Sequence, residues 1–502
     1  MRNKIILIFI TSITILTGFS CTKNFDDINS DPSLVTRENV APSMILTAVL
    51  KNSIFDSYND GVITEYSGYY SNQASGAIFR STDWANPFSD YYTNYLINTA
   101  EVIRLTASRP DMNDLNAMAR IWRVWLYHRL TDAYGDIPYT DAVQDIEHVK
   151  NQPGYDSQEY IYRDMLKELK EAAAQLGSVA GQLPIGSADL LYNGDAEAWK
   201  RFANSLRLRL AIRVSYAAPE LTQEQITDLG SADFIETNDQ NAKLVTKDLS
   251  AVNASDRNPL YNRYENQSFY PMWATFTTTD NLLRLNDPRL AVYAEAASDG
   301  VAGYRGRPLG LGADQKPRYT ETSTAVLGSR FWNSQYDIIV MNAAEVSFLR
   351  AEAALRGFIT DDAQALYTDG INKALEQYEI DPTAYLSSPA ATLTGTDEEK
   401  LEQIIVQKWL AIYFESNEAW AEYRRTGYPR IWLGTDADDN AGEIPRRIRY
   451  PLDEYAKNEV NVSSAVSKLT DGDQYASKVW WDKKDGLPFN HPRQGMYPPE
   501  QP

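Results

Sequence analysis

Residues whose types could bind a ligand gather in two stretches of this chain, 58–87 and about 248–332, which lack helical periodicity. Both combine aromatic rings with amides, acids and arginines. Flat rings stack on apolar ligand faces, and polar groups at the rim accept or donate hydrogen bonds, so this mix serves recognition without bond breaking. Long aperiodic loops inside a compact chain are commonly binding segments. The first stretch offers Asn72, Arg80 and Trp84, and the second offers Tyr270, Trp273, Tyr304 and Trp332.

Patterns for catalysis or metal binding are scarce by comparison. The chain has three histidines and one cysteine, and no HExxH, P-loop, GxSxG or CxxC motif. Asp436, Asp438 and Asn440 alternate as in a calcium loop, but Ala441 replaces the glycine and Arg447 the final glutamate of that motif. We expect a solvated acidic loop, no metal ligands and no cofactor, with structural calcium as the weaker alternative.

Composition limits the partners. The 502 residues carry 48 Lys and Arg against 68 Asp and Glu, a formal charge of -20, and phosphate binding needs a basic face, so we expect no nucleic-acid partner. With 43% hydrophobic and 23% charged residues, the mix is that of an ordinary globular protein.

The amino terminus resembles an export signal. Arg2 and Lys4 precede an apolar run over 5–16, which is too short to span a membrane and ends in the sequence TGFSC, like a bacterial lipobox. We predict that residues 1–20 are a signal peptide, that Cys21 carries lipid, and that 21–33 form a tether. Gly18 stands where many lipoboxes have leucine, and an ordinary signal peptide followed by a spare cysteine is the alternative.

Apolar residues at helical spacing predict a mostly helical chain. Ala119, Trp122, Leu126, Leu130 and Ala133 form one such stripe, which Gly135 should end. Short glycine-containing turns between helices favour helix pairs of the tetratricopeptide type. No linker divides the chain after the signal, so we expect one domain over 21–502. Further helices are predicted at about 90–107, 157–176, 195–215, 342–356, 361–378 and 398–415.

Several motifs together resemble one family, the SusD/RagB nutrient-binding lipoproteins of the Bacteroidetes outer membrane. The motifs follow in the family's order over almost the whole mature chain. They are FDDINSDP at 25–32, LTDAYGDIPY at 130–139, NDPRL at 286–290, LRAEA at 349–353, LYTDGI at 366–371, QKWLA at 407–411, EAWAEYRRTGYP at 418–429, PRRIRYP at 445–451 and VWWD at 479–482.

The resemblance implies an all-α fold, a tetratricopeptide-like helix-pair scaffold with long irregular loop insertions packed on one side. It implies an outer-membrane, lipid-anchored protein facing the cell exterior, which binds oligosaccharides and delivers them to a SusC-like TonB-dependent transporter without catalysis. A peptide ligand on the same scaffold is the first alternative. A lipid-anchored glycosidase and a structural subunit without ligand are further ones.

The resemblance also places the family's binding loop at the first irregular stretch, with Trp84 at the usual platform position. A saccharide has apolar C–H faces and equatorial hydroxyls, which the two stretches suit. For each residue taken singly, core packing is an equal alternative, and we expect at least two of Trp84, Tyr270, Trp273 and Trp332 to contact ligand. The predicted ligand-binding set is Trp84, Asn72, Arg80, Tyr270, Trp273, Tyr304 and Trp332.

Most family signatures have structural explanations. In the DAYGDIPY segment, Gly135 suits a helix end, Asp136 can bind local backbone, and Pro138 prevents the helix from restarting. The clustered arginines should pair with acids such as Glu418 and Glu422. We expect packing roles for four tryptophans and ion pairs for five arginines: Trp409, Trp420, Trp480, Trp481, Arg424, Arg425, Arg446, Arg447 and Arg449.

Overall fold

The computed structural model describes residues 40–71, 86–144, 148–247, 256–261, 272–312, 314–320, 322–434 and 443–496. The predicted signal peptide, Cys21 and the tether lie outside these residues. Within the described part, no helix is both long and apolar enough to cross a membrane.

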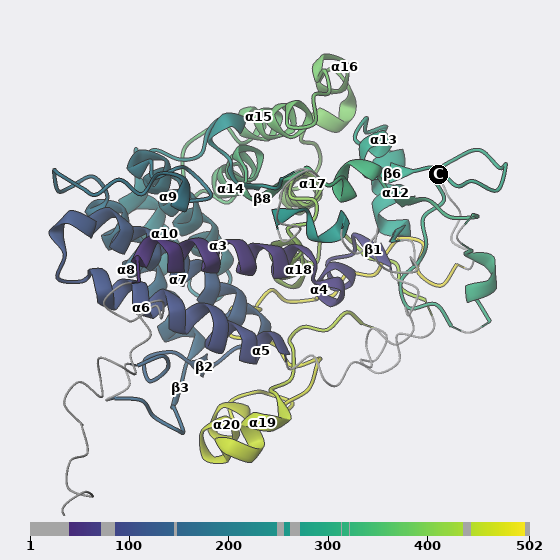
Figure 1. The fold of residues 1–502 in the computed structure, drawn as a ribbon. Coiled ribbons are helices and arrows are strands. Elements are labelled where there is room, and N and C mark those ends of the chain that lie inside the picture. The colour runs from purple at the N-terminus through teal and green to yellow at the C-terminus, as the bar shows by residue number, and fades with distance from the viewer. Residues whose placement is uncertain are drawn as a thin grey trace, which may run out of the picture.

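Packed helices form the scaffold, as predicted (Figure 1). Successive helices lie against one another: α6 on α7, α7 on α8, α8 on α9, and α14 on both α15 and α17. The all-α class and the helix-pair architecture are thus confirmed. The main helices are α3 (Pro42–Tyr58), α6 (Ile97–Thr106), α7 (Asn113–Tyr134), α8 (Gln158–Gln175), α9 (Ala196–Arg213), α10 (Pro219–Leu229), α14 (Ala343–Leu355), α15 (Ala363–Glu376), α17 (Asp397–Ala411) and α18 (Ser416–Thr426).

Irregular segments and a small sheet gather at one side, on the right in Figure 1. The sheet has the order β1 (Tyr70–Ser71), β5 (Trp273–Ala274), β7 (Val326–Leu327), β6 (Ala294–Glu295). Two further antiparallel pairs join β2 (Ile137–Pro138) to β3 (Tyr155–Asp156) and β4 (Ala242–Val245) to β8 (Asp337–Met341).

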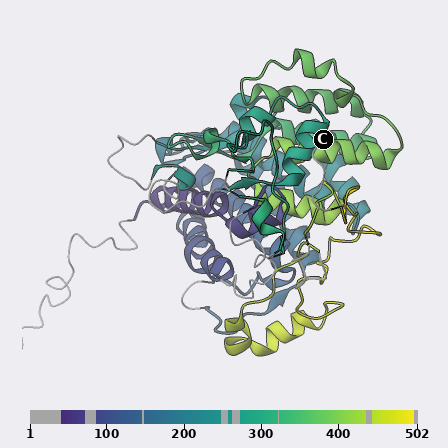
Figure 2. The ribbon, with the colours of Figure 1, turned by 90° about the vertical axis from the view of Figure 1, so that its right-hand side faces the viewer.

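Short helices complete the described fold, and two of them lie at the edge away from α14 and α15 (Figure 2). These two are α19 (Leu452–Lys457) and α20 (Glu459–Val466). The others are α4 (Gly61–Tyr66), α5 (Asn86–Asp90), α12 (Phe276–Arg284), α13 (Leu290–Tyr293), α16 (Thr383–Leu386), the π-helix η2 (Tyr91–Leu96) and the 3₁₀ turns η3 (Pro110–Met112), η4 (Gly186–Ala188), η5 (Asn238–Gln240), η7 (Lys316–Arg318), η8 (Ser329–Trp332) and η9 (Pro389–Ala391).

Side-chain caps fix the starts of α8 and α9. Ser157 accepts a hydrogen bond from Tyr160 N at the start of α8, and Asp195 accepts from Glu197 N and Ala198 N at α9. Gly135 ends α7 at φ +87°, a backbone conformation that favours glycine, and the Asp136 carboxylate accepts from Gln158 N. The structural interpretation of the DAYGDIPY segment is therefore confirmed.

Three expectations about element boundaries were wrong. The helix predicted over 398–415 ends at Ala411, and a separate helix, α18, begins at Ser416. Residues 58–87, expected to hold no helix, contain α4, which Asp60 caps. The stretch 248–332 contains α12, capped by Thr275, and the single turn α13.

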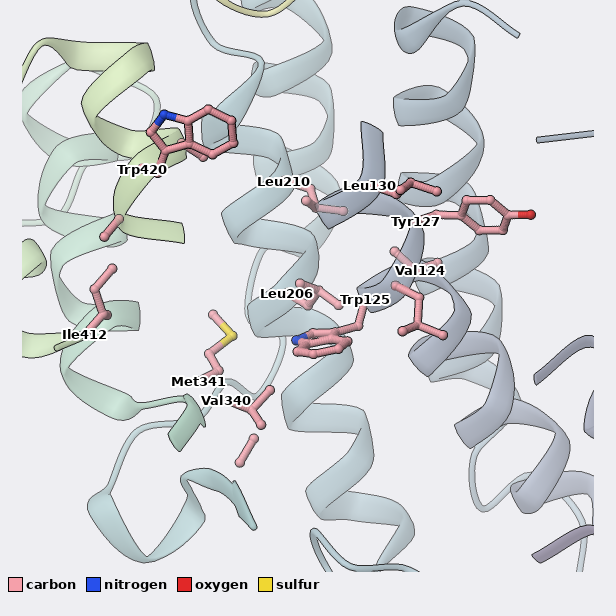
Figure 3. Close-up of a cluster of buried hydrophobic side chains, with 14 of the residues drawn as sticks. Val124, Trp125, Tyr127, Leu130, Leu206, Leu210, Val340, Met341, Ile412 and Trp420 are labelled. Carbon is pink, nitrogen blue, oxygen red and sulfur yellow. The ribbon is translucent and has the colours of Figure 1, made fainter. Parts of the chain in front are cut away.

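The hydrophobic core lies between the helices and β8. In Figure 3, Trp125 of α7 lies beside Leu206 of α9, with Val340 and Met341 of β8 across from them. Trp409, Trp420 and Trp481 are at most 1% exposed and Trp480 is partly buried, so the predicted packing roles are confirmed. Burying such large rings contributes the most hydrophobic area per residue.

A network of charged side chains is buried where α9, α14, α17 and α18 meet. Arg425 bonds to both carboxylate oxygens of Glu352 at 2.6 Å and to Glu422 at 2.9 and 2.6 Å. Lys408 lies 3.0 Å from Glu418, which also pairs with Arg213. Because lone buried charges are costly, this mutual pairing fixes how the helices meet.

The other clustered arginines behave differently from one another. Arg446 pairs with Asp482, and Arg447 pairs with Asp473. Arg424 donates instead to backbone carbonyls and lies 3.5 Å from the centroid of the Trp420 ring. The expected pairing with acids therefore holds for Arg425, Arg446 and Arg447, while Arg424 is held by carbonyls and a ring.

Candidate ligand-binding site

The two irregular stretches meet at one ladder. In the antiparallel pair of β1 and β5, Ser71 lies opposite Trp273, and Tyr70 lies opposite Ala274. Ser71 is the last described residue before 72–85, and Trp273 is the second after 262–271. The fold therefore pairs a strand of the first stretch with a strand of the second, although about 200 residues separate the two strands in sequence.

The N-terminus of α12 fastens this ladder. Thr275 caps α12 by accepting from Thr278 N at 3.0 Å, and its hydroxyl donates to the carbonyl of Gly68. The Thr278 hydroxyl donates to the carbonyl of Tyr69 at 2.9 Å. These bonds hold Gly68 and Tyr69 just before β1, so two threonine hydroxyls position the chain that enters this strand.

A second segment of the later stretch, 304–307, packs on the same helix start. Arg307 N donates to Ala274 O at 2.9 Å, and Phe276 N donates to Arg307 O at 2.9 Å. At Gly306 a Cβ atom would overlap the Thr275 carbonyl and the Thr279 hydroxyl. Only glycine permits this close approach, which fixes the neighbouring side chains at 305 and 307.

Trp273 and Arg307 form a stacked pair beside the ladder. The Arg307 guanidinium lies 4.1 Å from the centroid of the Trp273 ring. Trp273 is 2% exposed, and among the described residues its Nε1–H has no hydrogen-bond acceptor. Burial lowers the pKa of Arg307 to about 10, against an opposing effect of Glu65, so the guanidinium remains charged at neutral pH.

Tyr304 lies against the face of the small sheet. Its half-buried ring packs on the alanine cluster of Ala274, Ala294 and Ala325. Its neighbour Arg305 donates to the carbonyls of Ser323 and Val301 at 2.9 and 2.7 Å. This loop is therefore held on both sides of Tyr304, leaving part of that ring exposed.

The first stretch runs into the short helix α5, which is followed by a π-helix, η2. Such helices are rare and often occur at functional sites. Tyr92 donates to the carbonyl of Pro138 at 2.6 Å, Tyr95 bonds to Asp56, and the rings of Tyr91 and Tyr95 meet edge to face at 5.6 Å. These contacts hold η2 in place a few residues after Trp84 in the sequence.

The predicted ligand-binding residues divide into two groups. Trp273 is packed in the ladder, while Tyr304 and Trp332 are partly buried, Trp332 against the main core at the end of η8. Their roles in ligand binding stay predictions. The remaining four lie outside the described residues: Asn72, Arg80, Trp84 and Tyr270.

Sequence reasoning missed the residues that position the site. Thr275, Thr278 and Gly306 carry no aromatic or charged signal, although the Thr-x-x-Thr spacing before an apolar run is a helix-start pattern that could have indicated the cap. Among the described residues, no group of three or more His, Cys, Asp or Glu side chains could hold a metal ion. The possible calcium loop at Asp436 to Asn440 lies outside them.

Comparison with known proteins identifies the family and agrees with the fold. A family model described as SusD-like, starch-binding and associating with the outer membrane matches residues 34–451. No curated protein matches the sequence.

Solved structures supply further relatives. A chitin-binding protein is 28% identical, with a TM-score of 0.77 over 88% of this chain and 100% of the other. A chitin-binding SusD homolog from Flavobacterium johnsoniae is 28% identical, with a TM-score of 0.75 over 90% and 99%. A SusD homolog from Bacteroides uniformis is 27% identical, with a TM-score of 0.74 over 88% and 99%. The chain belongs to the SusD-like family, whose members associate with the outer membrane.

Proposed function

We propose that this protein binds oligosaccharides beside the pairing of β1 with β5, that residues of 72–85 and 262–271 contact the ligand, and that Trp84 is the main stacking platform. The observation that carries the proposal is the Ser71–Trp273 register, which joins both stretches to one ladder. Arg307 stacks on Trp273 of β5, and Tyr304 packs on the alanines of the same small sheet. Stacking and hydrogen bonds supply the binding free energy, and no bond is broken.

The ligand class follows from chemistry and family together. Aromatic planes with amide and arginine groups suit saccharide rings, and two relatives at 28% identity are chitin-binding proteins. We propose β-linked N-acetylglucosamine oligosaccharides as the first ligands to test. The chain acts as one domain over 21–502, lipid-anchored through Cys21 at the cell exterior, and delivers its ligand to a SusC-like TonB-dependent transporter.

Calorimetry and affinity electrophoresis of a soluble form beginning at Thr22 test this proposal. The panel holds chitin, plant and host glycans together with mixed peptides. We expect saturable glycan binding that Trp84→Ala strongly weakens and that Tyr160→Ala, a change of a 47% exposed ring on α8, leaves intact. Binding of peptides alone would overturn the ligand class, and release of reducing ends would make the protein a glycosidase.

The partner is tested on native membranes. Extraction in mild detergent should recover the protein together with a large outer-membrane barrel, and Cys21→Ser should abolish membrane attachment. Recovery of the full-length protein as a free monomer would contradict the transporter partnership.

A further inference from the structure

A polar groove lies apart from the ladder, between β8, β4 and the end of α15. Its volume is 820 Å³, within the range of small-molecule sites. Four segments form its walls: 329–330 at the start of η8; 333–339, which leads from η8 into β8; 238–243, which spans η5 and the start of β4; and 376–379 at the end of α15. None of the predicted ligand-binding residues lines it.

Hydrogen-bonding groups are available in this groove. The exposed side-chain amide of Gln335 and the Nδ2 of Asn333 have no hydrogen-bond partner among the described residues, whereas Asn333 Oδ1 accepts from Gln335 N at 3.1 Å. Tyr336 and Tyr378 also line the groove, but Tyr336 stacks on Tyr58, and Tyr378 is 5% exposed and packs on Tyr293. The free amide donors therefore carry the recognition, and they match the hydroxyl acceptors of a saccharide.

The charge of the groove selects among saccharides. Its two cations are already paired, Lys243 with Asp337 at 2.7 Å and Arg330 with Glu379 at 3.3 Å. Asp239 and Glu376 have no ion-pair partner among the described residues, and the carbonyl end of α15 adds partial negative charge. An acidic ligand would therefore be repelled, while a neutral or cationic one would not.

We propose that this groove is a second saccharide-binding site, selective for neutral or amino-bearing oligosaccharides over acidic ones. The inference rests on the proposed function, saccharide capture. Two sites on one chain would raise the avidity for a long polysaccharide, because the second contact becomes intramolecular.

The test uses three probes, the hexamers of N-acetylglucosamine, glucosamine and galacturonic acid, on the soluble chain with Trp84→Ala to silence the first site. The variant Asn333→Asp with Gln335→Glu keeps the acceptor oxygen that Gln335 N needs and removes both free amide donors. We expect about tenfold weaker binding of the neutral hexamer and unweakened binding of the glucosamine hexamer. The control, Gln223→Glu with Asn461→Asp on α10 and α20, makes the same charge change away from the groove and should leave both affinities unchanged.

Hydrogen exchange of the otherwise unaltered soluble chain provides a second readout that needs no variant. Saturating N-acetylglucosamine hexamer should protect amides in 329–339 and 374–379. Each of three results would overturn the second site. They are no protection in these two segments, equal affinities of the groove variant and its control for the N-acetylglucosamine hexamer, and tighter binding of the galacturonic acid hexamer than of the N-acetylglucosamine hexamer. If glycan binding depends wholly on Trp84 while the groove stays unprotected, the proposed function stands and this inference fails. If no glycan of the wider panel binds, both fail.

Discussion

Ser71 and Trp273 lie opposite each other in a two-residue antiparallel ladder, and this register joins the two irregular stretches of the chain. In the sequence, residues 72–85 follow directly after Ser71, and residues 262–271 end two positions before Trp273. A site assembled from loops gains precision when the loops start from one rigid point. Changes at the supports of this ladder should therefore alter ligand binding without removing any ligand contact.

The close approach at Gly306 gives the first such prediction. Gly306→Ala places a methyl group against the Thr275 carbonyl and the Thr279 hydroxyl, so the segment holding Tyr304 and Arg307 must move away from α12. We expect a chain that folds with a lower thermal midpoint and binds oligosaccharide at least tenfold more weakly. Calorimetry measures the affinity, with the exposed Ala302→Val as control. Wild-type affinity in Gly306→Ala would show that this segment does not shape the site.

The cap of α12 gives a second prediction. Thr275→Val removes the hydroxyl that accepts from Thr278 N and donates to Gly68 O. The expected loss is about 1–2 kcal/mol in the free energy of unfolding, together with weaker ligand binding. Denaturant unfolding checks the first effect, and Thr227→Val at an exposed position of α10 is the matched control. Equal losses of unfolding free energy in Thr275→Val and Thr227→Val would argue against a stabilising role of the α12 cap.

The buried ion network should be essential for stability. Arg425→Leu leaves Glu352 and Glu422 buried without the guanidinium that bonds to both, at an expected cost of about 3–5 kcal/mol in the free energy of unfolding. Arg163→Ala, which breaks a half-exposed pair with Glu159, should have no measurable effect. Adding Glu352→Leu to Arg425→Leu should recover part of the loss, and a failure to do so would contradict the pairing argument.

The same network predicts a pH dependence. Burial alone would raise the pKa of Glu422, but Arg425, Lys408 and Arg213 lower it to about 2, below its ordinary 4.5. A lowered pKa in the folded state stabilises the protein above pH 4.5, and this contribution is lost as pH falls towards 2. The stability difference between wild type and Glu422→Gln should therefore be largest at neutral pH and shrink between pH 4.5 and 2. Unfolding midpoints across this range measure it, and a constant difference would refute the assignment.

Local signals predicted the long helices well. Ser157 and Asp195 stand as caps before apolar stripes, and α8 and α9 begin directly after them. The break between α17 and α18 had no such signal, because Ile412 continues the apolar stripe. There the backbone leaves the helix and Phe414 adopts φ +73° without a glycine or proline to announce it.

The site was predictable in composition but not in geometry. Strands of two residues carry no periodic pattern, so the pairing of Tyr70 with Ala274 depends on contacts between distant parts of the chain. Trp273 is buried with Arg307 stacked over its ring, and Gly306 permits the close approach of the Arg307 segment to α12. An aromatic-rich stretch therefore indicates where a ligand binds, but not which of its rings are packed into the fold.

The claim that both irregular stretches contact one ligand is tested most directly by photo-crosslinking. The probe is a chitin oligosaccharide that carries a diazirine, and the labelled soluble chain is analysed by peptide mapping. Our account predicts that both 72–85 and 262–275 become labelled, and that excess unlabelled oligosaccharide suppresses the labelling of both together. Labelling of one stretch alone, or only of residues outside both, would contradict a binding site built where β1 and β5 meet.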